Sequence, residues 1–168
     1  MKMKLLAATI AVALPVLLSS CGTAATPQPA AAAPGVLVED AWVRATVGTK
    51  DKSMTAAFMS LTNPGGADVK LISATSPVAG LVQLHEMTKK DGKMVMQEKA
   101  GGVTVPATSH AHLTPGGDHI MLMNLKNPLK PGDEVPLTLK FSDNTTHDLK
   151  LPVKAFTEEE EHYHPTPK

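Results

Sequence analysis

Short runs of apolar and β-branched residues, separated by Pro, Gly, Asn and Asp, recur along most of this chain and limit it to an all-β fold. No segment has a sustained 3.6-residue period with helix caps, whereas the alternation typical of half-buried strands is repeated at short spacing. The pattern predicts a single domain built as a Greek-key β-sandwich or small barrel. The expected strands are Val36–Arg44, Thr55–Thr62, Asp68–Ala74, Leu81–Thr88, Lys93–Glu98, Gly102–Val105, His110–Leu113, His119–Leu125, Glu134–Phe141 and His147–Val153.

The N-terminus reads as an export signal. Two lysines precede the apolar run Leu5–Leu18, which is shorter than the roughly 20 residues that a transmembrane helix needs. The stretch Leu18-Ser19-Ser20-Cys21-Gly22 then resembles the lipobox of bacterial lipoproteins, in which the cysteine becomes the lipid-carrying N-terminus. We therefore expect residues 1–20 to be a lipoprotein signal peptide and Cys21 to anchor the exported protein to a membrane in the periplasm or cell envelope. An ordinary signal peptide is the alternative.

Composition divides the rest of the chain into three parts. Residues 21–35, mainly Ala, Thr and Pro, predict a flexible linker, residues 36–156 the folded domain, and residues 157–168 an acidic, disordered tail. Because Cys21 is the only cysteine, an intramolecular disulfide and a blue-copper site are both excluded. The formal charge is zero and no long basic run is present, so we expect no nucleic-acid partner. Membrane contact is expected through the lipid only, and the protein is expected to be a monomer.

A two-residue turn predicts a hairpin that carries an unusual set of side chains. Asp91-Gly92 is a strong hairpin signal, and alternation around it places His85, Met87, Met94 and Met96 on one face. His85 is then diagonal to Met96, about 7–8 Å away, which long side chains can bridge. The cross-strand pairs that follow from this turn are Lys90–Lys93, Lys89–Met94, Met87–Met96 and His85–Glu98.

A second strand repeats the combination of imidazole and thioether. Alternation in His119–Leu125 places His119, Met121 and Met123 on one face and apolar residues on the other. Thioether is a soft donor that selects Cu(I), whereas zinc sites rarely use methionine and calcium or magnesium prefer oxygen. For either cluster alone, a partly buried histidine among core methionines is the alternative. The two clusters together predict a Cu(I) site.

The spacing of these residues resembles that of the periplasmic copper chaperones of the PCu(A)C family. The family signature is a His, ten residues, a Met, about 21 residues, and then His-x-Met. Here ten residues separate His85 from Met96, and 22 separate Met96 from His119-Ile120-Met121. The resemblance covers nearly all of Val36–Val153. Further stretches that carry it are Asp40-Ala41-Trp42-Val43-Arg44, Leu84-His85-Glu86-Met87, Pro115-Gly116-Gly117, Met121-Leu122-Met123-Asn124-Leu125 and Pro136-Leu137-Thr138-Leu139.

The resemblance implies a cupredoxin-like β-sandwich with a Cu(I) site at one exposed edge. It assigns the ligands to His85, Met96, His119 and Met121, a choice that the hairpin argument alone leaves open among the methionines. Met87, Met94 and Met123 then support the ligands or pack beside them. The implied role is copper homeostasis in the periplasm, with copper delivered to Sco-type proteins or cytochrome oxidase subunits.

Other histidines are weaker metal candidates. His162 and His164 follow four glutamates in the tail, where a His-x-His motif can bind Cu(II), although a solvated tail is the alternative. His110 and His112 share one face of a short strand, where solvated histidines are common.

Three rival functions stay open from the sequence. A copper oxidase or dismutase would need an open coordination position beside a pocket, and neither paired carboxylates nor a Ser/His/Asp motif stands out, so we expect no enzyme. A lipoprotein for adhesion or scaffolding, with an immunoglobulin-like fold, would bind no metal. A copper store or scavenger would use the same site without a delivery partner.

Overall fold

The computed structural model describes residues 35–155. The predicted signal peptide, Cys21, nearly all of the predicted linker, and His162 and His164 lie outside the described residues. None of the described residues forms a helix long and apolar enough to span a membrane. The strands are β1 (Leu37–Arg44), β2 (Met54–Asn63), β3 (Val69–Thr75), β4 (Ala79–Lys90), β5 (Lys93–Glu98), β6 (Val103–Val105), β7 (Ser109–Leu113), β8 (His119–Leu125), β9 (Glu134–Phe141) and β10 (Thr146–Lys154).

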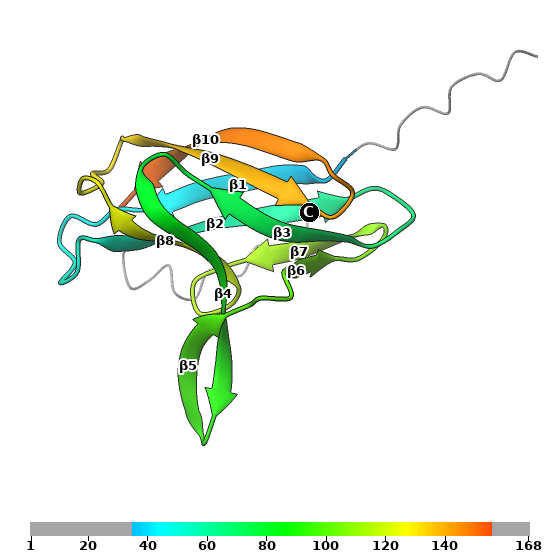
Figure 1. The fold of residues 1–168 in the computed structure, drawn as a ribbon, viewed down its shortest axis with the longest axis horizontal. Helices are drawn as coiled ribbons and strands as arrows, with labels where there is room; N and C mark the ends of the chain where they lie inside the picture. The colour runs from blue at the N-terminus through cyan, green and yellow to red at the C-terminus, as the bar shows by residue number, and fades with distance from the viewer. Residues whose placement is uncertain (1–34, 156–168) are drawn as a thin grey trace, which may run out of the picture. The chain divides into compact units, whose positions relative to one another are not determined.

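The strands form one hydrogen-bonded sheet that folds over itself into two layers (Figure 1). The first layer has the order β5-β4-β8-β2-β1, the second has the order β10-β9-β3-β6, and the parallel pair β1 and β10 joins them. β7 pairs with the second half of β2, beyond the half that pairs with β8. The predicted all-β sandwich is confirmed, and β5 is the terminal strand of the first layer.

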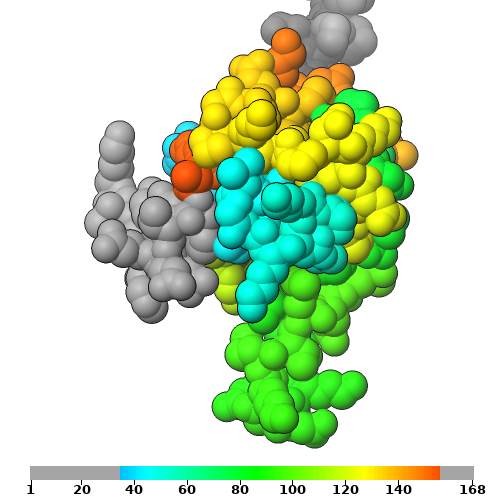
Figure 2. All heavy atoms as spheres, turned by 90° about the vertical axis from the view of Figure 1, so that its left-hand side faces the viewer, coloured from blue at the N-terminus to red at the C-terminus, as the bar shows by residue number. Residues whose placement is uncertain are grey.

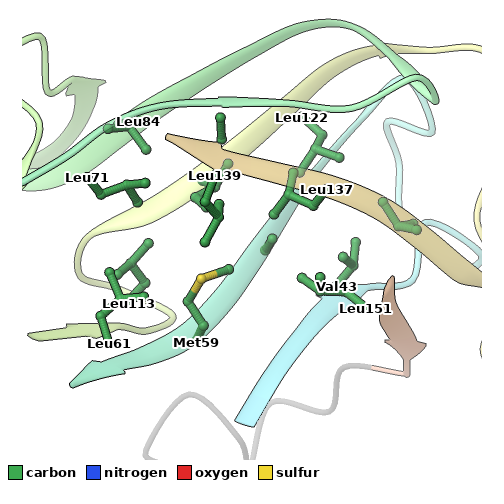
Figure 3. Close-up of a cluster of buried hydrophobic side chains, with 14 of the residues drawn as sticks. Val43, Met59, Leu61, Leu71, Leu84, Leu113, Leu122, Leu137, Leu139 and Leu151 are labelled. Carbon is green, nitrogen blue, oxygen red and sulfur yellow. The ribbon is translucent and has the colours of Figure 1, made fainter. Parts of the chain in front are cut away.

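Apolar side chains from both layers meet between them and form the core (Figure 3). In β9, for example, Val135, Leu137, Leu139 and Phe141 are buried, while the residues between them are exposed or half-buried. The first layer contributes Val43, Ala57, Met59, Leu61, Leu84, Ile120 and Leu122. The core therefore uses the inner face of the first layer and leaves the outer face to other side chains.

The β4–β5 hairpin extends beyond the rest of the domain (Figures 1 and 2). At its tip Asp91 and Gly92 both have positive φ, 51° and 79°, as a two-residue type I′ turn requires. The observed pairs Met87–Met96 and His85–Glu98 belong to the predicted register, which is confirmed throughout the hairpin.

β4 is longer than the sequence pattern predicts, with the bounds Ala79–Lys90 in place of Leu81–Thr88. It has different partners along its length: residues 79–85 pair with β8 and residues 85–90 pair with β5. The extension at the N-terminal end comes from pairing with β8, where Ala79 faces Leu125, and local alternation does not reveal it. Lys89 and Lys90, at the other end, already belong to the predicted hairpin pairs. The strand therefore runs from the body of the sandwich into the projecting hairpin.

Candidate metal centre

His85 and His119 are direct neighbours across β4 and β8 on the outer face of the first layer. Their ring centroids are 5.8 Å apart with the rings nearly edge to face. The next pair on the same face of these two strands is Gln83 and Met121. Side chains two residues apart share a face of a strand, so β4 and β8 present His85, His119 and Met121 on the same side.

Met96 approaches His119 from β5. Its sulfur Sδ lies 3.2 Å from Nε2 of His119. Met87, which faces Met96 across the hairpin, lines one groove together with Met96, His119 and Met121. The structure thus brings three of the four predicted ligands into this groove, with the His85 ring beside His119.

The hydrogen bond of His119 Nδ1 determines whether Nε2 of the same ring carries a proton. Nδ1 lies 2.9 Å from the carbonyl oxygen of Gly117, and because a carbonyl only accepts, Nδ1 carries the proton and donates it. In the neutral ring, Nε2 is then unprotonated and presents a lone pair. This lone pair faces the sulfur of Met96, which also carries lone pairs and donates no hydrogen.

The ring of His85 is held in a similar way by Gln83. The Gln83 amide nitrogen donates to Glu98 Oε2 at 2.9 Å, which directs the amide oxygen Oε1 towards His85 Nε2 at 3.2 Å. Nε2 therefore donates its proton, and Nδ1 carries the lone pair. Nδ1 is buried and has no hydrogen-bond partner among the described residues. Each histidine thus has one anchored N–H and one free lone pair, as metal-ligating histidines usually do.

Burial and a neighbouring ring favour the neutral form of His85. Desolvation lowers the pKa of His85, the nearby His119 lowers it further, and Glu98 opposes them. A lowered pKa leaves the imidazole neutral over a wider pH range. The neutral imidazole is the form that binds a metal ion.

The outer face of β8 is more enclosed than alternation predicts. Ile120 and Leu122 face the core as expected, but His119 and Met121 are only 5% and 7% exposed. The ring of Phe58 on β2 lies 6.3 Å from that of His119, and Pro115 lines the same groove. Met96 is 48% exposed, so the cluster is closed on the β8 side and open at the hairpin.

An ion-pair network joins Lys99, directly after β5, to Glu86 on the other face of β4 and to Asp118, directly before β8. Lys99 Nζ lies 2.8 Å from Glu86 Oε2 and 3.2 Å from Asp118 Oδ1. The hydrogen bond from Lys99 is the main reason that the pKa of Glu86 is lowered, and Gln97 adds a second one. Asp118 directly precedes His119, so the network joins the base of the hairpin to one of the clustered histidines.

The remaining predicted residues lie at different distances from the cluster. Met123 pairs with Leu81 and Met54, one step further along β8, and Met94 is 58% exposed near the hairpin tip. His110 and His112 are together on β7. Within residues 35–155, no group of three or more His, Cys, Asp or Glu side chains is placed to hold a metal ion. A metal site in the cluster of His85 and His119 therefore also needs the methionine sulfurs.

Sequence reasoning missed the groups that orient the two imidazoles. Gln83 precedes His85 by two residues on the same face, and Glu98 is the predicted cross-strand partner of His85. Both positions could therefore have been found from alternation and register. The Gly117 carbonyl could not, because a backbone acceptor leaves no signal in the side-chain pattern.

Comparison with known proteins places the chain in a family. The model of the family described as "Putative lipoprotein LpqE-like" matches residues 36–153. The chain belongs to this family. The "Putative lipoprotein Lxx21020" of Leifsonia xyli subsp. xyli is 42% identical to this LpqE-like chain over 163 residues, which are 95% of the chain and 96% of the relative.

Solved structures share the fold. The solution structure of CuI-DR1885, from Deinococcus radiodurans, is 36% identical with a TM-score of 0.60, over 75% of this LpqE-like chain and 82% of that one. The copper-bound PCuAC domain from PmoF2 has the same TM-score over 75% and 97% of the two chains, and at 21% identity it shows the fold alone. The resemblance to the PCu(A)C family that was predicted from the sequence is confirmed.

Proposed function

We propose that the protein binds Cu(I) through His85, Met96, His119 and Met121 and passes it on by ligand exchange. One observation carries the proposal: His119 Nε2 and Met96 Sδ lie 3.2 Å apart, and in the neutral ring neither atom has a proton to share. Two lone pairs that face each other gain nothing from this contact. A soft cation bound to both makes it favourable. The unpartnered Nδ1 of His85 supports the same interpretation, because a buried polar atom without a partner costs free energy.

The donor set favours copper in its monovalent state. Two thioethers and two neutral imidazoles carry no charge, so they suit a soft monovalent ion better than Zn²⁺, which usually takes thiolate, imidazole or carboxylate. The similar structure from Deinococcus radiodurans, described as CuI-DR1885, supports this choice. Copper is the cargo of the protein under this proposal, and no catalytic step is assigned to it.

The uneven exposure of the cluster supports delivery by exchange. Met96 is accessible on the projecting hairpin, while His119 and Met121 are buried. A thiolate or thioether of an acceptor can therefore replace Met96 first, before the buried ligands release the ion. We infer an exported, lipid-anchored carrier, with Cys21 as the lipidated residue and Sco-type proteins or cytochrome oxidase subunits as periplasmic acceptors. The lipoprotein relative from Leifsonia supports the anchor.

Transfer to an acceptor is the test that separates a chaperone from a copper store. The protein is loaded with one equivalent of Cu(I). It is then mixed either with a dithiol acceptor or with a variant of that acceptor in which serine replaces the cysteines. Copper should reach the dithiol acceptor faster than it reaches a chelator that can only trap released ion. Equal rates for the dithiol acceptor and for that chelator would favour storage. The absence of any bound Cu(I) would refute the proposal as a whole.

We expect Gln83→Leu to weaken Cu(I) binding by roughly tenfold, because it removes the carbonyl that orients His85 and keeps a side chain of similar size. A competition titration with a chromogenic Cu(I) chelator measures the effect. Gln97→Leu is the matched control, since Gln97 bonds Glu86 on the other face of the same hairpin. Equal losses in the two variants would mean that Gln83 acts only through hairpin stability.

The tail histidines His162 and His164 lie outside the described residues, and their binding of Cu(II) stays a prediction. Replacing both by Asn in the full chain and titrating with Cu(II) tests it. The Cu(I) affinity should be the same in this variant, because the four proposed ligands are unchanged.

A further inference from the structure

We propose that His110 and His112 form a second metal site, which binds a divalent first-row ion and prefers Cu(II). The two residues occupy alternate positions of β7, so their side chains leave the sheet on the same side. Their ring centroids are 4.7 Å apart, with 53° between the ring planes. Both residues are exposed, so an ion can reach them from solvent.

Ser60 on β2 holds one of the two rings. His112 lies opposite Ser60 in the pairing of β2 and β7, and Nδ1 of His112 is 3.0 Å from Ser60 Oγ. This contact fixes the orientation of the ring and leaves Nε2 of His112 available for a metal ion. A ring that is already oriented loses less entropy on binding, as in other metal sites whose ligands are held by a second hydrogen bond.

Carboxylates lie on β1, which pairs with the edge of β2 opposite to β7. Glu39 pairs with Ser60 across β1 and β2, and its Oε2 accepts a hydrogen bond from Thr62, the residue opposite His110. Asp40 lines a groove that His112 also lines. Lys154 lines this groove as well, but its Nζ lies over the Trp42 ring at 5.9 Å. The acidic groups favour a cation without closing its coordination sphere.

The donor class decides the preferred ion. Neutral imidazoles with water suit tetragonal Cu(II), which binds nitrogen and oxygen donors more tightly than Ni(II) or Zn(II) does. This pair contains no thioether, in contrast to the cluster of His85, Met96, His119 and Met121. Phe58 and Pro115 line both the groove beside His112 and the groove beside His119. The two sites are therefore neighbours on one face of the first layer but differ in the oxidation state that they select.

The test uses Cu(II) as the probe and the full chain with His162→Asn and His164→Asn, which removes the tail histidines. Glycine serves as the competing ligand. In this background, His110→Asn with His112→Asn should weaken Cu(II) binding by roughly 100-fold, because a chelating pair is lost. His147→Asn is the matched control, since His147 is a histidine of β10 in the second layer, and it should leave the affinity unchanged.

Paramagnetic broadening of amide NMR signals locates the ion without any variant in the β7 pair. Substoichiometric Cu(II) should broaden the signals of Ser60, Thr62 and residues 109–113 first. The Cu(I) affinity should be equal with and without His110 and His112, so the outcome does not depend on the Cu(I) proposal. Broadening centred on His85 and His119, or unchanged Cu(II) affinity in the double variant, would overturn the second site.

Discussion

Cu(I) affinity should fall by more than about 100-fold in His119→Ala, the largest loss of affinity expected for any single substitution in the chain. His119 is the centre of the cluster: its Nε2 faces Met96 Sδ, its ring lies beside that of His85, and its Nδ1 is anchored on the Gly117 carbonyl. Alanine removes a nitrogen donor and leaves a space between the remaining ligands. A competition titration with a chromogenic Cu(I) chelator measures the change.

Because His119 is buried, the fold of this variant must be checked by its thermal melting, and a second substitution makes the test independent of folding. Met96→Ala removes an exposed side chain, so it should leave the fold intact and lower the affinity by roughly tenfold or more. Met94→Ala is its matched control, from the same strand and the same face but nearer the tip. If Met96→Ala and Met94→Ala bind Cu(I) as tightly as the native protein, the assignment of Met96 is wrong.

The hairpin could be predicted in detail because neighbouring residues in the sequence determine its turn and its register. Asp91-Gly92 accepts the two positive φ angles that a type I′ turn needs, and once the turn is placed every cross-strand pair follows from counting. The face of each side chain then follows from alternation. The register from Lys90–Lys93 to His85–Glu98 therefore needed no tertiary information.

The meeting of β4 with β8 could not be derived in this way. Thirty-three residues separate His85 from His119, and nothing in the local pattern of either strand says which of the other strands it pairs with. Only the family motif placed these two histidines together, and the pairing of β4 and β8 agrees with it. The burial of His119 and Met121 was also missed, since it depends on Phe58 and Pro115, which lie far from β8 or in the preceding turn.

The second large effect concerns stability. Gly102 lies in the connection between β5 and β6, where the chain leaves the first layer for the second, and its φ is +74°. A Cβ added at Gly102 would be 2.5 Å from the carbonyl oxygen of Leu71 in β3, so the backbone of one strand has to move. We expect Gly102→Ala to lower the free energy of unfolding by about 3 kcal/mol or more, from the left-handed conformation and the steric clash together.

Gly92→Ala separates these two contributions. Gly92 has nearly the same φ, +79°, but a Cβ there meets no atom within 4 Å in the described part of the chain. Gly92→Ala should lower the free energy of unfolding only by the penalty of the left-handed conformation, about 1–2 kcal/mol. Chemical denaturation of both variants gives the comparison. The difference between them measures the close approach of the β5–β6 connection to β3, and equal losses in Gly102→Ala and Gly92→Ala would show that this contact does not constrain the fold.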